Sequence, residues 1–303
     1  MKNIAIVTDS NSGITQAQAK KLGVNVLPMP FYINDTLFYE DINLTQEEFY
    51  AHLAEGSEIS TSAPAVGDVT DLWDSLLKEY DEIVHIPMSS ALSSTCETLM
   101  MLAQGYRGRV FVVDNKRISV TQKQAVLDAQ MMAAAGWDGA RIREKLLSTM
   151  YDCSIYISLD TLYYLKKGGR ITPAVAALGT LLRIKPVLQI QGDKLDTYAN
   201  ARTKKSARTM MLDAIRKDCR ARFGAGETAG RACDSKNDDG LILCMAYTGA
   251  YTDEAQSWEK EIEDAFPAHA GRLLMDPLSL SISCHIGPGA IGIGCIKKLQ
   301  LTD

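Results

Sequence analysis

The sequence lacks long hydrophobic runs and paired cysteines. None of its 303 residues belongs to an apolar run of the roughly 18 residues that a membrane-spanning helix needs. The start, MKNIAIVTDSNSG, has too short an apolar run for a secretory signal. The seven cysteines are odd in number, scattered and contain no CxxC pair. These absences predict a cytoplasmic protein with reduced thiols and no membrane span.

Basic clusters and the common catalytic motifs are also missing. The 32 Lys and Arg residues are dispersed among 37 Asp and Glu, so no basic face is available for nucleic acid phosphates. No turn carries a P-loop lysine, and no G-x-S-x-G nucleophile elbow occurs. Only His85 and His285 of the four histidines lie near apolar strand-like runs, and no residues have metal-ligand spacing. We therefore expect no nucleic acid partner, no metal and no cofactor.

What the sequence does contain is short apolar runs that alternate with helix-period segments. In the first half, the runs NIAIVTD (3–9), EIVHIP (82–87) and RVFVVD (109–114) each precede a polar turn and a helix-like segment. This pattern is typical of a parallel sheet covered by helices. FYINDTLFYED (31–41) predicts a hairpin at Asn34-Asp35, and residues 64–80 predict a helix.

The pattern of the second half differs. Residues 161–169 predict a short helix capped by Asp160, 185–203 two antiparallel strands, and 204–223 a long helix. The GPGAIG stretch at 287–292 predicts a tight turn between two strands. We therefore predict an α/β protein of two domains. Residues 1–151 would form a three-layer domain with a parallel sheet, and residues 152–303 a mixed-sheet α/β domain.

Small hydroxyl residues follow several of the predicted strands. The stretch HIPMSSALSSTCETL places five of them between a strand-like and a helix-like run: Ser89, Ser90, Ser93, Ser94 and Thr95. Ligands of open α/β sheets bind beyond the carboxyl ends of the strands, and helix starts favour anions. Each hydroxyl could instead cap a helix, but five within seven residues exceed what capping needs. The cluster therefore predicts a site for a carboxylate or a similar small anion.

Seven motifs, in order along the chain, resemble the DegV family. They are VTDSNSGIT, STSAPAVGDV, SSALSSTCET, YYLKKGGRI, LLRIKPVL, ARTKKSA and HIGPGAIGIG. The resemblance runs from residue 4 to about 298 and is interrupted chiefly near 224–239. It implies a bacterial protein that encloses one long-chain fatty acid, with the carboxylate at the junction of two domains. It also implies presentation of that carboxylate to a separate ATP-dependent fatty acid kinase, with no turnover by the binding subunit itself.

The resemblance also implies which residues bind. The family's carboxylate contacts match Thr61 in TSAP and Ser93 in LSST, with His285 of HIGPG as a third candidate. Their neighbours complete the expected ligand-binding set, which is Thr61, Ser62, Ser93, Ser94 and His285.

Three further residues have implied roles outside this set. Ser10 and Arg170 are candidates for the ligand or the domain junction, and Arg202 of ARTKKSA matches the arginine implicated in docking the kinase. The chain has Ser94 where the family usually has Gly, and Ala65 where it usually has Ser. The added hydroxyl could crowd or contact the carboxylate, and the lost one could be only a helix cap.

Two other functions stay open from the sequence. One is an enzyme acting on a small anion, such as a serine-dependent hydrolase at the same interdomain cleft. The other is a binding module for a different amphiphile. Exchange of a fatty acid with a membrane would need at most a transient contact.

Overall fold

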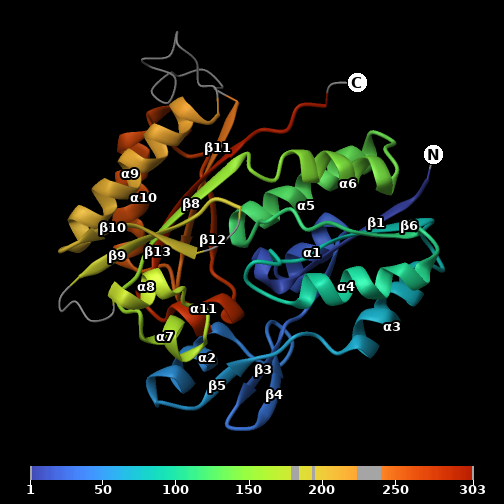
Figure 1. Ribbon diagram of the computed structural model, residues 1–303, viewed down its shortest axis with the longest axis horizontal. Coiled ribbons are helices and arrows are strands. Elements are labelled where there is room, and N and C mark those ends of the chain that lie inside the picture. The colour runs from blue at the N-terminus through green and yellow to red at the C-terminus, as the bar shows by residue number, and fades with distance from the viewer. Residues whose placement is uncertain (1, 179–183, 193–194, 224–239, 302–303) are drawn as a thin grey trace. The chain divides into compact units, whose positions relative to one another are not determined.

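The computed structural model describes residues 2–178, 184–192, 195–223 and 240–301 (Figure 1). The chain forms two compact units. Unit 1 comprises Met1–Met150, Ser279–Ser281 and Leu301–Asp303, and unit 2 comprises Tyr151–Leu278 and Ile282–Gln300. A three-residue segment from the second half of the chain thus belongs to unit 1.

A four-stranded parallel sheet organises unit 1. Its strand order is β2-β1-β6-β7, with β1 (Ile4–Asp9), β2 (Asn25–Leu27), β6 (Glu82–Ile86) and β7 (Val110–Val112). All residues of β1 and β6 are buried, as expected for parallel strands that are covered on both faces. The three strands predicted from the first half are confirmed.

Helices lie on both faces of this sheet (Figure 1). On one face, Trp73 and Leu99 share a core cluster with Val7 and Val112 of the sheet. They come from α3 (Val66–Leu76) and α4 (Thr95–Ala103). The opposite face contacts α5 (Ser119–Ala134) and α6 (Gly139–Ser148). Shorter helices of unit 1 include α1 (Gln16–Leu22), η1 (Ser10–Ser12) and η2 (Gln104–Tyr106). The predicted three-layer α/β arrangement is confirmed.

A small antiparallel sheet with the order β4-β3-β5 completes unit 1. Its strands are β3 (Pro30–Ile33), β4 (Thr36–Tyr39) and β5 (Ile59–Thr61). The predicted hairpin turns at Asn34 and Asp35, whose φ angles of 47° and 66° suit a two-residue turn with left-handed backbone. Phe31 packs against Phe49 of α2 (Gln46–Ala54), with ring centroids 6.0 Å apart.

Unit 2 contains a six-stranded mixed sheet with the order β10-β9-β8-β13-β11-β12. All neighbouring strands are antiparallel except β11 and β12, so the predicted mixed sheet is confirmed. The core against it contains Ile215 of α9 (Lys204–Ala221) and Trp258 of α10 (Asp253–Ala265). The strands are β8 (Cys153–Ser158), β9 (Lys185–Ile190), β10 (Leu195–Ala201), β11 (Leu241–Tyr247), β12 (Leu274–Pro277) and β13 (Ile291–Lys297).

Two predictions for the second half were wrong. Before GPGAIG the chain forms a helix, α11 (Leu280–Ile286), rather than a strand, so the turn joins α11 to β13. Asp160 does not cap α7 (Tyr163–Lys167), whose cap residue is Leu162. Instead, its carboxylate forms ion pairs with two lysines that are described below.

The segment after α7 contains α8 (Pro173–Leu178), and residues 179–183 lie outside the described ranges. Residues 224–239, where the resemblance to the DegV family is interrupted, lie outside them entirely. A short 3-10 helix of unit 2 is η4 (Pro267–His269).

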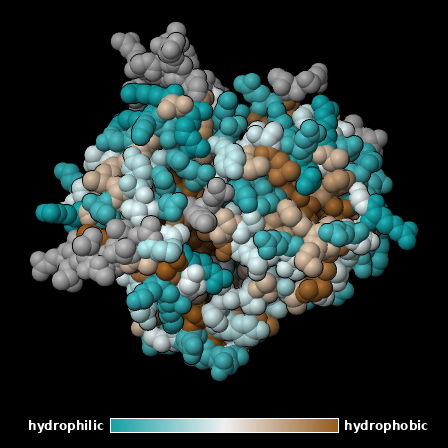
Figure 2. Space-filling view, in the orientation of Figure 1, coloured by the Kyte–Doolittle hydropathy of each residue, from teal (hydrophilic) through white to brown (hydrophobic). Residues whose placement is uncertain are grey.

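The surface is mostly hydrophilic on the face drawn in Figure 2, where hydrophobic residues show as smaller areas. Exposed large hydrophobic residues such as Ile42, Met101 and Tyr163 come from different parts of the chain, which is ordinary for a folded protein. Within the described ranges, no helix is long and apolar enough to cross a membrane.

Candidate polar site and charged network

Asp9 hydrogen-bonds to both the turn after β1 and the turn after β6, at the carboxyl edge of the parallel sheet. It is fully buried at the end of β1 and accepts hydrogen bonds from the backbone N–H of Asn11 (3.0 Å), the N–H of Met88 (2.8 Å) and Gln122 Nε2 (3.1 Å). Burial raises the pKa of Asp9, and these hydrogen bonds oppose the shift. Because β2 and β6 flank β1 on opposite sides, this edge is the position where open α/β sheets bind ligands.

Ser10 contacts a buried carboxyl group that the sequence did not reveal. Its Oγ accepts the Met29 N–H at 3.1 Å, and its hydroxyl acts to lower the pKa of the nearby Glu40 carboxyl. Glu40 Oε1 accepts the Leu280 N–H at 2.9 Å, whereas Oε2 has no partner among the described residues. Burial raises the pKa of Glu40 to about 8. Glu40 is the third residue of FYED, in the stretch for which the sequence predicted only a hairpin.

The segment Ser279–Ser281 brings further hydroxyl groups to the turn after β1. The Ser281 hydroxyl donates to Asn11 Oδ1, and the Ser279 and Ser281 hydroxyls are 3.4 Å apart. Asn11 is completely buried, and its Nδ2 has no partner in the described part of the chain. Asn11 Nδ2, a donor, and Glu40 Oε2, a carboxyl oxygen, therefore remain for a polar ligand or ordered water.

The predicted hydroxyl cluster also has local structural tasks. Ser89 Oγ accepts the Ala91 N–H at 3.2 Å, and Ser93 Oγ accepts the Thr95 N–H at 3.2 Å. Lys116 Nζ donates to Ser90 Oγ at 2.6 Å. Local hydrogen bonds thus occupy part of the cluster, although none of them is a side-chain N-cap of α4 (Thr95–Ala103). The Ser93 hydroxyl donates to Thr95 Oγ1 at 3.0 Å. Because a hydroxyl group can rotate, it could donate to a ligand instead.

Ser94 differs from these residues because its side chain is exposed and makes no cap hydrogen bond. It is the N-cap residue of α4 with φ −72°, a conformation that does not require glycine. The departure from the family's usual glycine therefore adds an exposed hydroxyl without backbone strain.

Thr61 and Ser62 lie where β5 leads toward α3. Thr61 is half-buried and pairs with Phe31 across the small sheet. Ser62 is exposed, and its backbone N–H donates to the Pro30 carbonyl at 3.1 Å. Ala65 is the N-cap residue of α3 and supplies no side-chain cap, so a serine at this position would have a helix N-terminus to cap.

In unit 2, His285 of α11 lies directly on Gly168, the residue that follows α7. A Cβ built on Gly168 would lie 2.9 Å from His285 Cε1 and closer still to Nδ1. Arg170 donates to the Gly168 carbonyl at 2.7 Å. Burial and then the Arg170 charge lower the pKa of His285 to about 4, so the imidazole is neutral at neutral pH. It can therefore hydrogen-bond a carboxylate only as a neutral donor.

Gly168 and Gly169 have different reasons to be glycine. Gly168 has φ −79°, which any residue can adopt, but it has no room for a side chain. Gly169 has φ +68° and open space around it, so its requirement is conformational. The sequence indicated only a helix end for both.

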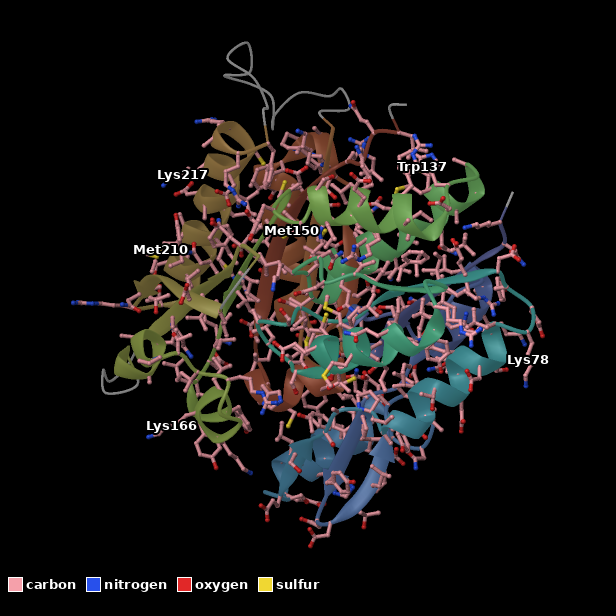
Figure 3. The ribbon with its side chains drawn as sticks, turned by 45° about the vertical axis from the view of Figure 1, so that its right-hand side comes forward. Lys78, Trp137, Met150, Lys166, Met210 and Lys217 are labelled. Atoms are coloured by element: carbon pink, nitrogen blue, oxygen red, sulfur yellow. The ribbon has the colours of Figure 1, made fainter. Side chains whose placement is uncertain are left out.

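Lys166 of α7 is exposed, and its side chain points away from the helix in Figure 3.

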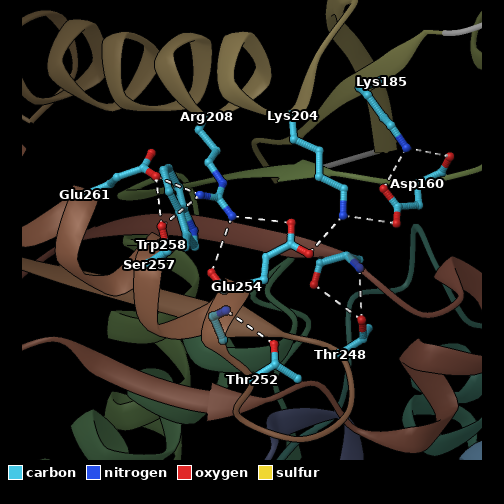
Figure 4. Close-up of polar contacts among 12 residues, drawn as sticks. Asp160, Lys185, Lys204, Arg208, Thr248, Thr252, Glu254, Ser257, Trp258 and Glu261 are labelled. Carbon is cyan, nitrogen blue, oxygen red and sulfur yellow. Dashed lines mark hydrogen bonds and ion pairs between the residues drawn. The ribbon is translucent and has the colours of Figure 1, made fainter.

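A network of charged residues holds the start of α9 (Figure 4). Lys204 pairs with Asp160 at 3.3 Å and with Glu254 at 2.9 Å, and Arg208 pairs with Glu261 at 2.7 Å. We call the set the Asp160 network; its members are Asp160, Lys185, Lys204, Arg208, Glu254 and Glu261. Arg202, two residues before Lys204, is exposed and forms no hydrogen bond or ion pair with any described residue.

The structure gives no support to a histidine base at His85. Its imidazole is fully buried and its Nδ1 accepts the indole N–H of Trp73 at 3.1 Å. Burial lowers its pKa to about 3, so it is a neutral core residue. The described residues also contain no group of acidic, histidine or cysteine side chains that could hold a metal ion.

The predicted site residues are divided between the two units. Unit 1 contains Ser10, Thr61, Ser62, Ser93 and Ser94, and unit 2 contains Arg170, Arg202 and His285. The sequence missed Glu40 and Asp160 as members of these polar groups. No spacing rule could have found them, because their partners are distant in the chain.

Known proteins are similar to this chain over almost its whole length. Residues 3–298 match the family described as "Uncharacterised protein, DegV family". The DegV domain-containing protein SA1258 of Staphylococcus aureus (strain N315) is 27% identical over 293 residues, which are 97% of this chain and 98% of the relative.

Solved structures share the fold. A fatty-acid-binding DegV family protein from Thermus thermophilus has 28% sequence identity and a TM-score of 0.84, with 97% of this chain and 99% of that chain covered. DegV, a fatty acid binding protein from Bacillus subtilis, has 23% identity and a TM-score of 0.82, with 98% and 100% covered. The chain belongs to the DegV family.

Proposed function

We propose that the protein binds one long-chain fatty acid in the cytoplasm and presents its carboxylate to a separate ATP-dependent fatty acid kinase. The observation that carries the binding proposal is the similarity in sequence and fold to the fatty-acid-binding protein from Thermus thermophilus. The polar edge of the unit 1 sheet supports it, because this edge offers hydroxyl and amide groups suited to a small anion.

Neutral donors suffice for the carboxylate end. Thr61 and Ser93 are the proposed hydroxyl donors, with Ser62 and Ser94 beside them, and His285 is a proposed neutral donor. Hydrogen bonds to an ionised group are stronger than those between neutral groups, so a few can orient the ligand. Ser10 and Arg170 act in this proposal by holding Glu40 and the Gly168 carbonyl, respectively.

The acyl chain supplies most of the affinity. Burial of about 14 methylenes at ~0.8 kcal/mol each gives roughly 11 kcal/mol, which exceeds a binding cost of several kcal/mol. The protein itself performs no turnover in this proposal and needs no cofactor. The phosphoryl transfer belongs to the kinase, and exposed Arg202 is the proposed contact with it.

Two experiments test the two parts of the proposal. Native mass spectrometry of freshly purified protein should show a co-purified fatty acid. After its removal, a C16 or C18 fatty acid should bind more tightly than the alcohol of equal length. An empty protein that hydrolyses esters would instead support the hydrolase alternative, and equal binding of the alcohol would support a different amphiphile.

The kinase part requires a separate assay. Purified cognate kinase, ATP and the loaded protein should form acyl-phosphate at a rate that saturates with the concentration of this protein. If the loaded protein binds fatty acid but never supports phosphorylation, presentation to a kinase is wrong and binding stands alone.

A further inference from the structure

Asp160 lies where three segments of unit 2 meet. Its Oδ1 is 2.7 Å from Lys185 Nζ at the start of β9, and its Oδ2 is 3.3 Å from Lys204 Nζ at the start of α9. Figure 4 shows both contacts. A Cβ built on Gly289 would lie 3.1 Å from Asp160 Cγ and nearer to Oδ2, so the carboxylate also packs on the turn after α11. One side chain thus contacts β9, α9 and the HIGPG turn.

The turn that meets Asp160 is itself closely packed. A Cβ on Gly287 would lie 3.0 Å from Cγ of Tyr164, a residue of α7. Gly287 and Gly289 have φ angles of 76° and 77°, which favour glycine at both positions. His285 precedes this turn by only two residues, so its position depends on the packing of the turn.

Lys204, the partner of Asp160 on α9, fixes the segment that carries Arg202. Lys204 pairs with Glu254 as well as Asp160. Its partial burial acts to lower its pKa, but the hydrogen bonds and charges of these two partners outweigh that effect and raise the pKa. Lys204 and Arg208 are therefore occupied by intramolecular partners, while Arg202 is exposed.

We propose that Asp160 is a positioning residue that couples the His285–Gly289 turn to the Arg202–Lys204 segment, so that ligand binding and partner docking influence each other. This inference rests on the proposed function. Its physical basis is that a shared carboxylate between two lysines holds three segments together, and its removal leaves two ammonium groups facing each other. Ion pairs joined into a network hold their geometry better than isolated surface pairs.

Asp160→Asn is the principal test, because it removes the charge and keeps the shape. Asp213→Asn is the matched control: Asp213 lies on α9, is 65% exposed, and pairs with Arg216 at 3.0 Å away from the Asp160 network. With loaded protein, we expect Asp160→Asn to raise the half-saturating concentration for the kinase about 3- to 30-fold with little change in maximal rate. Asp213→Asn should match the wild type. Equal half-saturating concentrations for both variants would overturn the inference.

A second measurement needs no kinase. In backbone hydrogen exchange, added C16 fatty acid should slow exchange at 287–292 and also at 203–207 in the wild type. In Asp160→Asn the effect at 203–207 should disappear. Two results would refute the coupling. Either the fatty acid does not slow exchange at 203–207 in the wild type, or it still slows exchange there in Asp160→Asn. If no fatty acid binds at all, the proposed function fails; faster exchange of both segments in unliganded Asp160→Asn would still support the structural link.

Two lysine variants keep the inference testable if Asp160→Asn does not fold. Lys204→Gln breaks the link from Asp160 to α9, whereas Lys185→Gln leaves that link in place. We expect Lys204→Gln to abolish the ligand effect at 203–207 and Lys185→Gln to retain it. The same outcome for both lysine variants would show that Asp160 does not carry the coupling to α9.

Discussion

Replacing Gly168 with alanine tests the contact that positions His285. The added Cβ would lie 2.9 Å from His285 Cε1, whereas ordinary carbon contacts begin at about 3.5 Å. The imidazole must therefore move by at least about 0.6 Å at this atom, and further at Nδ1, which is nearer. Alanine near a helix end would ordinarily stabilise the chain by up to ~1 kcal/mol relative to glycine. An overpacked contact costs about 1–3 kcal/mol, so we expect net destabilisation.

The displaced imidazole has two measurable consequences. The pKa of His285, which burial holds at about 4, should rise toward its usual value of 6.5 as the ring becomes more exposed. Loss of its proposed hydrogen bond should weaken fatty acid binding by about 1–3 kcal/mol, or roughly 5- to 150-fold. NMR titration of the imidazole and competition binding of a fluorescent fatty acid measure these effects.

Gly169→Ala is the matched control for this experiment. It has open space but φ +68°, so the substitution costs about 1–2 kcal/mol of backbone strain without touching His285. Both variants should lose similar stability in denaturant unfolding, but only Gly168→Ala should change the His285 pKa and the fatty acid affinity. Equal affinities for the two variants would refute the assignment of His285 to the ligand.

Four further predictions concern other residues. Burial raises the pKa of Glu40 to about 8. The contribution of Glu40 to the free energy of unfolding is therefore fully present below about pH 4.5 and is lost as the pH rises toward 8. Glu40→Gln should remove this pH-dependent loss of stability, which amounts to at most about 4 kcal/mol between pH 5 and 8.5. If urea unfolding of the variant shows the same pH dependence as the wild type, the prediction is wrong. Thr61→Ala with Ser93→Ala should weaken fatty acid retention by about 1–3 kcal/mol per change, and retention equal to wild type in native mass spectrometry would exclude both donors. Ala65→Ser should stabilise α3 by about 1 kcal/mol, measured by thermal unfolding, because the N-cap there has no side-chain bond; no gain would mean the hydroxyl does not cap. Arg202→Ala should bind fatty acid normally but slow acyl-phosphate formation, with a smaller difference from the wild type at high salt because salt screens the lost charge, and wild-type rates at limiting protein would make it an ordinary surface charge.

The sequence predicted those elements whose pattern directly reflects their burial. The run IAIVTD is apolar throughout because β1 is covered on both faces, and Asn34-Asp35 supports the left-handed backbone of a two-residue turn. The polar turns after β1 and β6 could be located because they follow these strands directly. Resemblance in the ordered motifs supplied the family.

The same reasoning failed at α11 for a physical reason. PLSLSISCHIG alternates apolar residues and serines, which is typical of a half-buried strand. The structure is helical, and the serines are buried as well: Ser281 bonds to Asn11, and the Ser283 hydroxyl donates to the Leu278 carbonyl at 3.4 Å. Hydrogen bonding satisfies these hydroxyls inside the protein, so polarity no longer marks the exposed face.

By itself, the sequence determined the main strands of the parallel sheet, the hairpin at Asn34-Asp35 and the family, because each depends on neighbouring residues or on ordered motifs. Only the tertiary structure decided which side chains meet. Gly168 lies beside His285, more than a hundred positions away, and Asp160 beside Lys204. Glu40 accepts the N–H of Leu280, 240 positions later. These contacts set the pKa of Glu40 and of His285, because burial and nearby charge depend on the packing of distant segments.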